Sequence, residues 1–434
     1  MVVNLKPTAD SDIHSEIWLP LIAWNGKFLE VGNGGWGGPV DYGEMADGLA
    51  HGYAVAATDD GNTTRGSAAF LMGHPEKMVD FAYRAEHETA VEAKLLIRSF
   101  YGREARLSYW NGCSGGGREG LLEAFRHPED FNGIVAGDPA NMRRNAWALW
   151  LANETFKDPA SVIPPAKYPA IHRAVLDACD ANDGLKDGLI ENPEQCHPDF
   201  SKLACKGADG IDCLTPRQVK TAQTIGSPAT DAAGHVYFPR LEPGTELAWG
   251  RLAGGPEPGT LFWGEFRYVV YRDPKWDWRN FDLARDAAKA NAVNQGVLEL
   301  DPHLAAFAKR GGKLMIYHGW ADQQVAPGSS VEFYKDAVSA SGDAAHAADW
   351  VRLFMIPGMG HCGGGEGPDT FDKIGVMEAW VESGKAPARI VAAHHTAGGK
   401  VDRTRPLCPY PQMARYGGSG SVDDASNFRC EAAR

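Results

Sequence analysis

The sequence predicts an α/β fold in which helices cover both faces of a mostly parallel central sheet. Short apolar strands alternate with helical segments through the first 140 residues, as such a sheet requires. The alternation stops between about residues 141 and 300, where Trp, Pro, Gly and Asp are frequent, and it resumes near residue 313. We therefore expect one domain built from residues 1–140 and 301–434, with residues 141–300 as a separately folding insertion.

The elements of the first half follow from local patterns. Predicted strands occupy residues 29–31, 53–58, 107–110 and 134–136. Helical spacing is seen over residues 79–101, with Val91, Leu95, Leu96 and Phe100 on one side, and again beyond residue 115, with Leu121, Leu122 and Phe125. In the second half we expect strands at 313–317 and 351–356, and helices at 329–340 and 370–384.

The composition of the chain argues against some classes of binding partner. With 44% hydrophobic and 23% charged residues, the chain resembles ordinary globular proteins. A net charge of -13 and the lack of a Lys/Arg run argue against nucleic-acid and membrane partners. No apolar stretch is long enough for a transmembrane helix, and the first residues show no signal-peptide pattern. Eight cysteines form an even set, which fits disulfides in an oxidising compartment.

A glycine-rich turn carries the first candidate catalytic residue. Gly112-Cys113-Ser114-Gly115-Gly116 matches the Gly-x-Ser-x-Gly nucleophile elbow and lies between a predicted strand and a predicted helix, as that motif requires. Small neighbours permit a tight turn that exposes the serine oxygen at a helix N-terminus, where backbone N–H groups stabilise negative charge. This motif predicts Ser114 as the nucleophile of an α/β-hydrolase fold.

A serine nucleophile needs a base and an orienting carboxylate, which in this fold follow in the order Asp, then His, each after a strand. Asp322 follows the predicted strand at 313–317, and His361 follows the one at 351–356. If Ser114 and His361 meet, their neighbours Cys113 and Cys362 also come close, and a disulfide can join them.

Other residues compete less well for these roles. His318 ends a strand but precedes the acid, so we expect a structural histidine bonded to backbone. Asp369 and Asp372 follow His361 and break the chain order. Cys113 offers a thiol nucleophile instead of Ser114, but that register loses the first glycine of the elbow.

The oxyanion hole needs two backbone N–H donors aimed at the developing alkoxide. Gly115, the residue after the nucleophile, supplies one in this geometry. Gly34-Gly35, in the glycine-rich loop after the strand at 29–31, resembles the loop that supplies the other in esterases, and we favour Gly35. A plain turn remains the alternative for this loop.

These motifs together resemble the tannase and feruloyl esterase family of α/β-hydrolases, which also contains mono(hydroxyethyl) terephthalate hydrolase. The resemblance spans nearly the whole chain and rests on Trp24-Asn25-Gly26-Lys27-Phe28, Gly32-Asn33-Gly34-Gly35, Tyr109-Trp110-Asn111-Gly112-Cys113-Ser114, Gly133-Ile134-Val135-Ala136-Gly137, Asp322, His361-Cys362 and Arg405-Pro406-Leu407-Cys408-Pro409-Tyr410-Pro411. It implies that residues 141–300 form a lid domain. It also implies four disulfides: Cys113–Cys362, Cys179–Cys196, Cys205–Cys213 and Cys408–Cys430.

The insertion contains a loop, residues 179–189, with three carboxylates in eight positions and two glycines. From spacing alone, a solvated turn and a site for a hard cation are equally good interpretations. The family resemblance implies a structural Ca²⁺ held by Asp180, Asp183, Asp187 and the main-chain oxygens of Leu185 and Leu189. We expect no organic cofactor.

We therefore expect a serine carboxylic ester hydrolase acting on small aromatic esters. Feruloyl esters are the preferred interpretation, with galloyl esters or the terephthalate monoester as alternatives; a serine peptidase or a catalytically silent binding protein for aromatic ligands is more distant. Eight lid aromatics are available to a phenolic ring, of which two or three are expected to contact it: Trp147, Trp150, Phe262, Trp263, Phe266, Tyr268, Trp276 and Trp278. The disulfides and the family imply a secreted or periplasmic protein, whereas the sequence does not indicate an oligomeric state.

Overall fold

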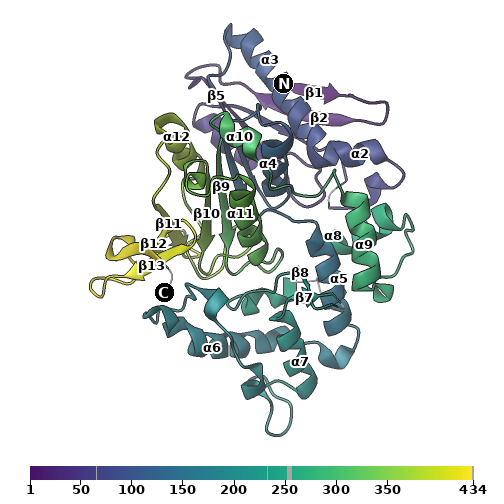
Figure 1. Cartoon of the computed structure of the whole chain (residues 1–434), viewed down its shortest axis with the longest axis vertical. Helices are drawn as coiled ribbons and strands as arrows, with labels where there is room; N and C mark the ends of the chain where they lie inside the picture. Colours follow the sequence, from purple (N-terminus) through teal and green to yellow (C-terminus); the bar gives the residue numbers. More distant parts are fainter. Residues whose placement is uncertain (65, 232, 252–256, 433–434) are drawn as a thin grey trace.

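A computed structural model describes residues 1–64, 66–231, 233–251 and 257–432. At its centre lies an eight-stranded sheet with the order β1-β2-β4-β3-β5-β6-β9-β10 (Figure 1). Its strands are β1 (Val2–Leu5), β2 (Ile13–Trp18), β3 (Lys27–Val31), β4 (Ala54–Thr58), β5 (Leu107–Cys113), β6 (Gly133–Gly137), β9 (Lys313–Gly319) and β10 (Val351–Ile356). Every pair from β4 to β10 is parallel, and only β1–β2 and β2–β4 are antiparallel. The predicted mostly parallel sheet is confirmed.

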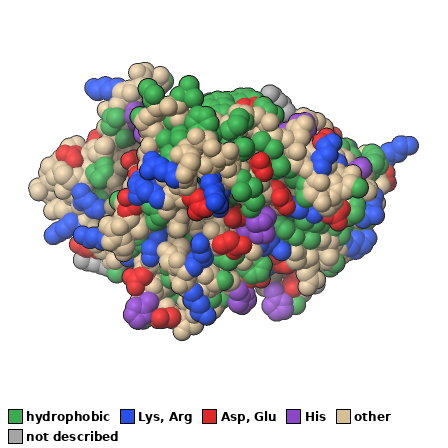
Figure 2. All heavy atoms as spheres, turned by 90° about the horizontal axis from the view of Figure 1, so that it is seen from above, with side chains coloured by type: hydrophobic (Ala, Val, Ile, Leu, Met, Phe, Trp, Pro, Cys, Tyr) green, Lys and Arg blue, Asp and Glu red, His purple; other side chains and the backbone are tan. Residues whose placement is uncertain are grey.

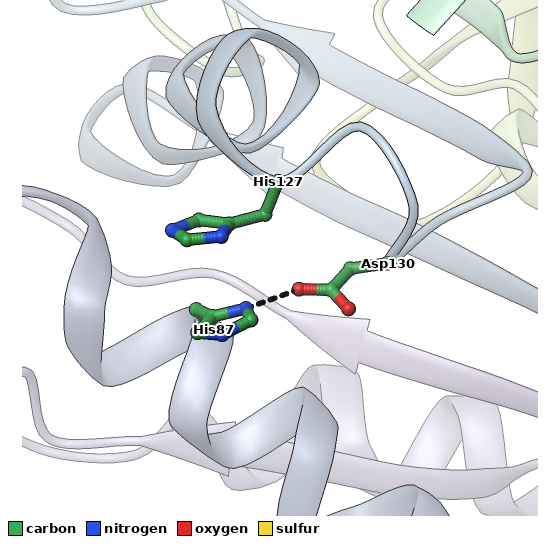
Figure 3. A group of neighbouring side chains, drawn as sticks. All are labelled: His87, His127 and Asp130. Atoms are coloured by element: carbon green, nitrogen blue, oxygen red, sulfur yellow. Dashed lines mark hydrogen bonds and ion pairs between the residues drawn. The ribbon is translucent and has the colours of Figure 1, made fainter.

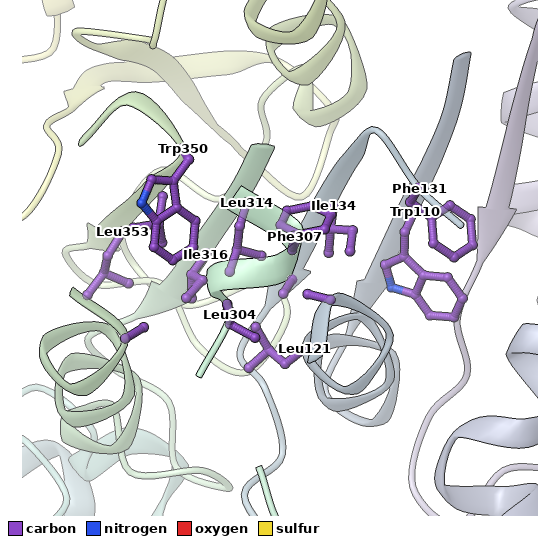
Figure 4. Packing of buried hydrophobic residues seen from close by; sticks show 14 of the residues in the cluster. Trp110, Leu121, Phe131, Ile134, Leu304, Phe307, Leu314, Ile316, Trp350 and Leu353 are labelled. Atoms are coloured by element: carbon purple, nitrogen blue, oxygen red, sulfur yellow. The ribbon is translucent and has the colours of Figure 1, made fainter. Parts of the chain in front are cut away.

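Helices cover both faces of this sheet because successive strand residues point to opposite sides. On β5, Trp110 packs into the core beneath α3, α4, α10 and α11, whereas Tyr109 packs into the core beneath α1 and α12. Figure 4 shows the first of these cores, in which aromatic and branched side chains from strands and helices interdigitate. The helices are α1 (Tyr42–Ala50), α3 (Ala85–Tyr101), α4 (Gly115–Arg126), α10 (Ala305–Lys309), α11 (Gly328–Ala340) and α12 (Lys373–Ser383).

The helical segment predicted at 79–101 exists, but its predicted apolar side is wrong. Helix α2 (Pro75–Val79) and one π-helical turn (Asp80–Arg84) lead into α3, which buries Ala85, Ala90, Ala93 and Ile97. Three of the four residues expected on the apolar side are at least one third exposed: Val91, Leu95 and Phe100. Alanines let the helix axis approach β4 closely, so small residues rather than large ones mark the packed side.

Residues 141–300 contribute no described strand to the large sheet. Their helices are α5 (Arg143–Thr155), α6 (Tyr168–Cys179), α7 (Pro216–Ile225), α8 (Thr260–Gly264) and α9 (Leu283–Asn294), and a short hairpin pairs β7 (Ala229–Thr230) with β8 (Val236–Phe238). In Figure 1, α6 and α7 lie at the lower end of the molecule, whereas α8 and α9 lie higher on its right side. They pack around two hydrophobic cores that are almost entirely their own. The domain boundaries at 140 and 300 stay a prediction.

The C-terminal region adds two small antiparallel sheets that the sequence patterns did not predict. They pair β11 (Ile390–His395) with β12 (Val401–Leu407), and β13 (Gln412–Tyr416) with β14 (Phe428–Ala432). Strands β1 and β2 were also missed; β2 buries Ser15 between Ile13 and Ile17, so its apolar alternation is incomplete.

The four disulfides join the pairs that the family resemblance implied. Among the described residues, no helix is both long and apolar enough to cross a membrane. On the face drawn in Figure 2, Lys and Arg side chains lie among Asp and Glu side chains instead of gathering into one basic area.

Candidate functional site

Ser114 lies in a sharp turn between β5 and α4. Its φ of +61° is a strained value for a residue with a side chain, and its N–H donates to Gly137 O at 2.9 Å. The turn depends on glycine at 112, because a Cβ there would lie 2.6 Å from the backbone of Gly116. This is the geometry of a nucleophile elbow, which lifts the serine oxygen above the end of the sheet.

Three loops at the carboxyl ends of parallel strands bring Ser114, Asp322 and His361 together. The Nε2 atom of His361 lies 2.8 Å from Ser114 Oγ, and its Nδ1 atom lies 2.7 Å from Asp322 Oδ2. This spacing fits the tautomer in which Nδ1–H donates to the carboxylate while Nε2 accepts from the hydroxyl. The three residues therefore form a continuous hydrogen-bonded relay from Ser114, at the wall of a cleft, to a fully buried acid.

Asp322 is held in its charged form although it is completely buried. Burial on its own raises the pKa of this carboxyl, but the neighbouring His361 and the hydrogen bonds from His318 and His361 outweigh burial and leave the pKa below its usual range. The backbone N–H groups of Gln324 and Val325 donate to Oδ1 at 2.6 and 3.0 Å. Oδ2 is thus left for the imidazoles.

His318 is a second histidine on the acid. Its Nε2 lies 3.1 Å from both Asp322 Oδ2 and Val325 O, and 3.5 Å from Asp138 Oδ1. The expected bond to backbone is present, but the bond to the acid was not foreseen. Burial lowers the pKa of His318, yet the two carboxylates outweigh it and raise the pKa above its usual range.

Asp138 is a site residue that the sequence analysis missed. It follows β6 directly, accepts from Gly319 N at 3.0 Å, and burial raises its pKa to about 6. Its position at the carboxyl end of a parallel strand is the same signal that identified Asp322 and His361. It extends the buried chain of titratable groups from His361 through Asp322 and His318.

The competing assignments find no support in the geometry. Cys113 forms the disulfide with Cys362, so it carries no thiol. Asp369 accepts from Gly364 N, and Asp372 accepts from Gly375 N at the start of α12. Within the described residues, neither aspartate is hydrogen bonded to His361.

The glycine-rich loop after β3 lies against the start of α4 and is held by Asn33. The Asn33 carbonyl accepts from Gly116 N at 2.6 Å, its backbone N–H donates to Glu119 Oε2 at 3.0 Å, and its side-chain Nδ2 donates to Thr58 O and Asp60 Oδ1 at 2.7 Å each. In the described part of the chain, the N–H groups of Gly115 and Gly35 have no protein acceptor. Gly35 borders the same cleft as Ser114. Gly115 follows Ser114 directly and lies against Gly34 of the glycine-rich loop.

This cleft has a volume of about 910 Å³ and lies between the elbow, the glycine-rich loop, His361 and the predicted lid. From residues 141–300, Thr260 and Leu261 line it, and Leu261 lies beside Gly35. None of the eight lid aromatics singled out in the sequence lines the cleft, as far as the structure describes it. Five of them, Trp147, Phe262, Phe266, Trp276 and Trp278, are buried in the lid's own cores.

The acidic loop at 180–189 closes through its own backbone. Asp180 is buried and accepts from Asp187 N and Gly188 N at 3.1 and 3.0 Å, while Gly184 and Gly188 adopt left-handed conformations. Burial, followed by the charges of Asp187 and Asp180, raises the pKa of Asp183. Among the described residues Asp180 has no cationic partner, whereas Asp187 is paired with Arg405. The donors are hard oxygen atoms, which suits Ca²⁺.

The sequence of this chain is similar to those of known esterases. The sequence model of the family described as tannase and feruloyl esterase matches residues 1–247 and 258–431. A probable feruloyl esterase B-1 of Aspergillus terreus is 36% identical over 453 residues, which cover 98% of this chain and 84% of that protein.

Solved structures give the same picture. Feruloyl esterase B from Aspergillus oryzae superposes with a TM-score of 0.93 at 32% identity, covering 99% of this chain and 90% of that one. Tannin acyl hydrolase from Aspergillus niger has a TM-score of 0.84 at 22% identity, covering 100% and 85% of the two chains. The latter similarity shows the shared fold alone.

Proposed function

Because the chain belongs to the tannase and feruloyl esterase family and is therefore a carboxylic ester hydrolase, we propose that it hydrolyses esters of aromatic acids through Ser114, His361 and Asp322. The observation that carries this proposal is the relay in which His361 lies 2.8 Å from Ser114 Oγ and 2.7 Å from Asp322 Oδ2. Similar names and a similar fold do not by themselves supply a mechanism, whereas this arrangement does.

In the first step, Ser114 Oγ attacks the ester carbonyl carbon while His361 Nε2 takes the hydroxyl proton. The imidazolium then gives this proton to the departing alcohol, which leaves an acyl-enzyme on Ser114. In the second step, His361 deprotonates a water that attacks the acyl carbon, and the proton returns to Ser114 as the acid departs. Asp322 keeps the imidazole oriented and stabilises its charge throughout.

Gly115 and Gly35 are the proposed oxyanion donors. Support comes from the position of Gly35 in the cleft of Ser114, from the position of Gly115 directly after Ser114, and from their N–H groups, which have no acceptor among the described residues. Asn33 is a positioning residue in this proposal, because it ties the loop of Gly35 to Gly116 and Glu119 of the nucleophile helix. Fixed donors cost no reorganisation when the negative charge develops.

Feruloyl and related hydroxycinnamoyl esters are the proposed substrates. The 36% identical relative and the 32% identical structure are both named feruloyl esterases, and the cleft of about 910 Å³ has room for such an acyl group. We expect kcat/KM to be highest for methyl ferulate or methyl coumarate in a panel that also contains methyl gallate and the mono(hydroxyethyl) ester of terephthalate. A preference of 10-fold or more for gallate or terephthalate would replace this assignment with one of those two alternatives.

The loop at 180–189 is proposed to hold a structural Ca²⁺ through Asp180, Asp183, Asp187 and the main-chain oxygens of Leu185 and Leu189. Its support is the burial of Asp180, which has no Lys or Arg partner among the described residues, and the mutual repulsion of the carboxylates. A bound cation offsets that repulsion and rigidifies the loop. The catalytic steps use only side chains and backbone groups of the cleft.

We also propose that the protein works in a secreted or periplasmic setting. Four disulfides support this location, because such bonds persist in oxidising compartments. Treating the folded protein with a thiol reductant tests whether its activity depends on them.

A further inference from the structure

Two histidines and an aspartate that take no part in the proposed reaction meet at the end of α4 (Figure 3). His87 lies on α3, His127 follows the last residue of α4, and Asp130 lies in the turn before β6. A ligand atom from each, namely one ring nitrogen per histidine and one carboxylate oxygen, lies within 4.8 Å of the other two. None of the three residues lines the catalytic cleft.

The carboxylate of Asp130 is fixed with one oxygen toward the histidines. Its Oδ2 accepts from His87 Nδ1 at 2.6 Å, while Lys94 Nζ donates to Oδ1 at 3.1 Å and to the Asp130 carbonyl at 2.7 Å. The Asp130 side chain is only 5% exposed. A partner that holds the outer oxygen of a ligating carboxylate is a regular feature of metal sites.

His127 is the unexplained member of the group. Among the described residues, neither of its ring nitrogens has a hydrogen-bond partner, although the side chain is half-buried. Its ring stacks on that of His87, with 3.7 Å between centroids and 13° between planes. An imidazole whose nitrogens are not engaged by the described protein can offer one of them to a metal ion.

We propose that His87, His127 and Asp130 bind a divalent transition metal ion, with Zn²⁺ the best match, and that water completes its coordination. Two imidazole nitrogens and one carboxylate oxygen suit Zn²⁺ better than Ca²⁺ or Mg²⁺, which prefer oxygen donors only. The ion replaces the proton between His87 and Asp130, whose atoms separate from 2.6 Å to the roughly 3.3 Å typical of two tetrahedral zinc ligands. Rotation of the unbonded His127 ring about its Cβ–Cγ bond turns a nitrogen toward the ion.

Charged side chains of both signs lie around the proposed metal site. Glu88 and Glu129 add negative charge around the two rings, whereas Arg126 and Lys94 add positive charge. The guanidinium of Arg126 is stacked on Tyr83 and bonded to the Gly296 carbonyl, and the ammonium of Lys94 is committed to Asp130. The bound ion would tie α3 to the segment that follows α4, the helix that begins beside Ser114.

The test is titration of Zn²⁺ into the disulfide-bonded protein in saturating Ca²⁺, so that the loop at 180–189 is occupied. We expect one Zn²⁺ per chain by calorimetry and a rise in melting temperature. His127→Ala is the informative variant because the side chain of His127 makes no hydrogen bond within the described residues, and the substitution leaves its backbone hydrogen bonds in place. It should weaken binding by at least about 10-fold, as loss of a ligand requires, and remove the thermal shift.

His346→Ala is the matched control, because the His346 side chain is exposed and, as far as the structure describes the chain, forms an ion pair with Asp343 alone. It should bind Zn²⁺ like the wild type. Co²⁺ offers a second measurement: its visible spectrum should show tetrahedral or five-coordinate absorption that is absent in the His127→Ala protein. The proposal is overturned if the wild type binds no stoichiometric Zn²⁺, or if His127→Ala binds it with unchanged affinity.

Discussion

Cys113 and Cys362 form a disulfide that joins the residue before Ser114 to the residue after His361. Their α-carbons lie 5.9 Å apart although the two cysteines are separated by 249 positions in the chain. The bond therefore connects the turn of Ser114 to the loop of His361, although residues 141–300 lie between them in the chain. None of the other three disulfides joins these two loops.

The Cys113→Ala/Cys362→Ala double variant should lose activity under conditions where it stays folded. Closing so long a loop contributes about 5 kcal/mol in the chain-entropy treatment, so the variant should also unfold at a lower urea concentration. We expect kcat on methyl ferulate to fall by about 10-fold or more, because a misplacement near 1 Å is costly to catalysis. The control is Cys205→Ala/Cys213→Ala in the lid, which should keep its kcat. Full activity in the folded Cys113→Ala/Cys362→Ala variant would show that the disulfide stabilises the fold but does not position the catalytic residues.

Asn33→Ala should lower kcat and leave KM within about 3-fold. The substitution removes the hydrogen bonds to Thr58 and Asp60 that hold the loop of Gly35, and loss of one oxyanion donor typically costs 100- to 1000-fold, so we expect a partial loss of about 10- to 100-fold. Steady-state kinetics on methyl ferulate gives kcat and KM separately and so measures both effects. Asn153→Ala, in the lid, is the control. A change confined to KM would count against the positioning role.

His172 should make stability depend on pH in the alkaline range. On α6 of the lid, it bonds Glu246 and also Glu366, which lies in the loop after His361, at 2.8 Å each. Burial opposes its charge, but the two glutamates prevail and raise its pKa to about 9, above the unfolded value near 6.5. The stabilisation is thus fully present below pH about 6.5 and is lost as pH rises through 9.

Urea unfolding of the wild type between pH 6.5 and 9.5 should therefore show a loss of about 1 to 3 kcal/mol that is absent in His172→Gln. His346→Gln, which removes an exposed pair, should retain the wild-type slope. Parallel curves for the wild type and His172→Gln would disprove the assignment.

Chelation of Ca²⁺ by EGTA should lower the melting temperature by several degrees, because an ion that binds only the folded state stabilises it. Asp180→Asn should melt lower and respond little to EGTA. Asp177→Asn, which changes an exposed acid nearby, should behave like the wild type. An unchanged melting curve, together with no calcium detected by elemental analysis, would show that the loop does not bind Ca²⁺.

Much of the fold and of the relay was predictable because the signals are local. Ser114 lies in a short motif, and Asp322 and His361 each follow an apolar strand in the required order. The supporting contacts were not predictable in this way. Asn33 meets Glu119 across 86 positions, and Asp138 meets Gly319 across 181, so these contacts exist only once the strands are side by side. The position of Asp138 after β6 marks it as a candidate, but its contacts are not readable from that position.

The apolar side of α3 was misjudged for a related reason. Large residues such as Leu95 dominate any hydrophobicity pattern, yet Ala90 and Ala93 permit the close approach to the sheet. Packing distance, rather than hydrophobicity, decided which side faces the core. In the lid, aromatic residues suggested a binding surface, but Trp147 and Phe266 fill its interior.

The central claim is that Ser114, activated by His361 and Asp322, attacks the ester. The most direct measurement is kcat/KM of Ser114→Ala on methyl ferulate relative to the wild type, with circular dichroism to verify the fold. We predict a fall of at least about 1000-fold, as for other serine hydrolases that lose their nucleophile. A folded Ser114→Ala protein that hydrolyses methyl ferulate at the wild-type rate would contradict the claim.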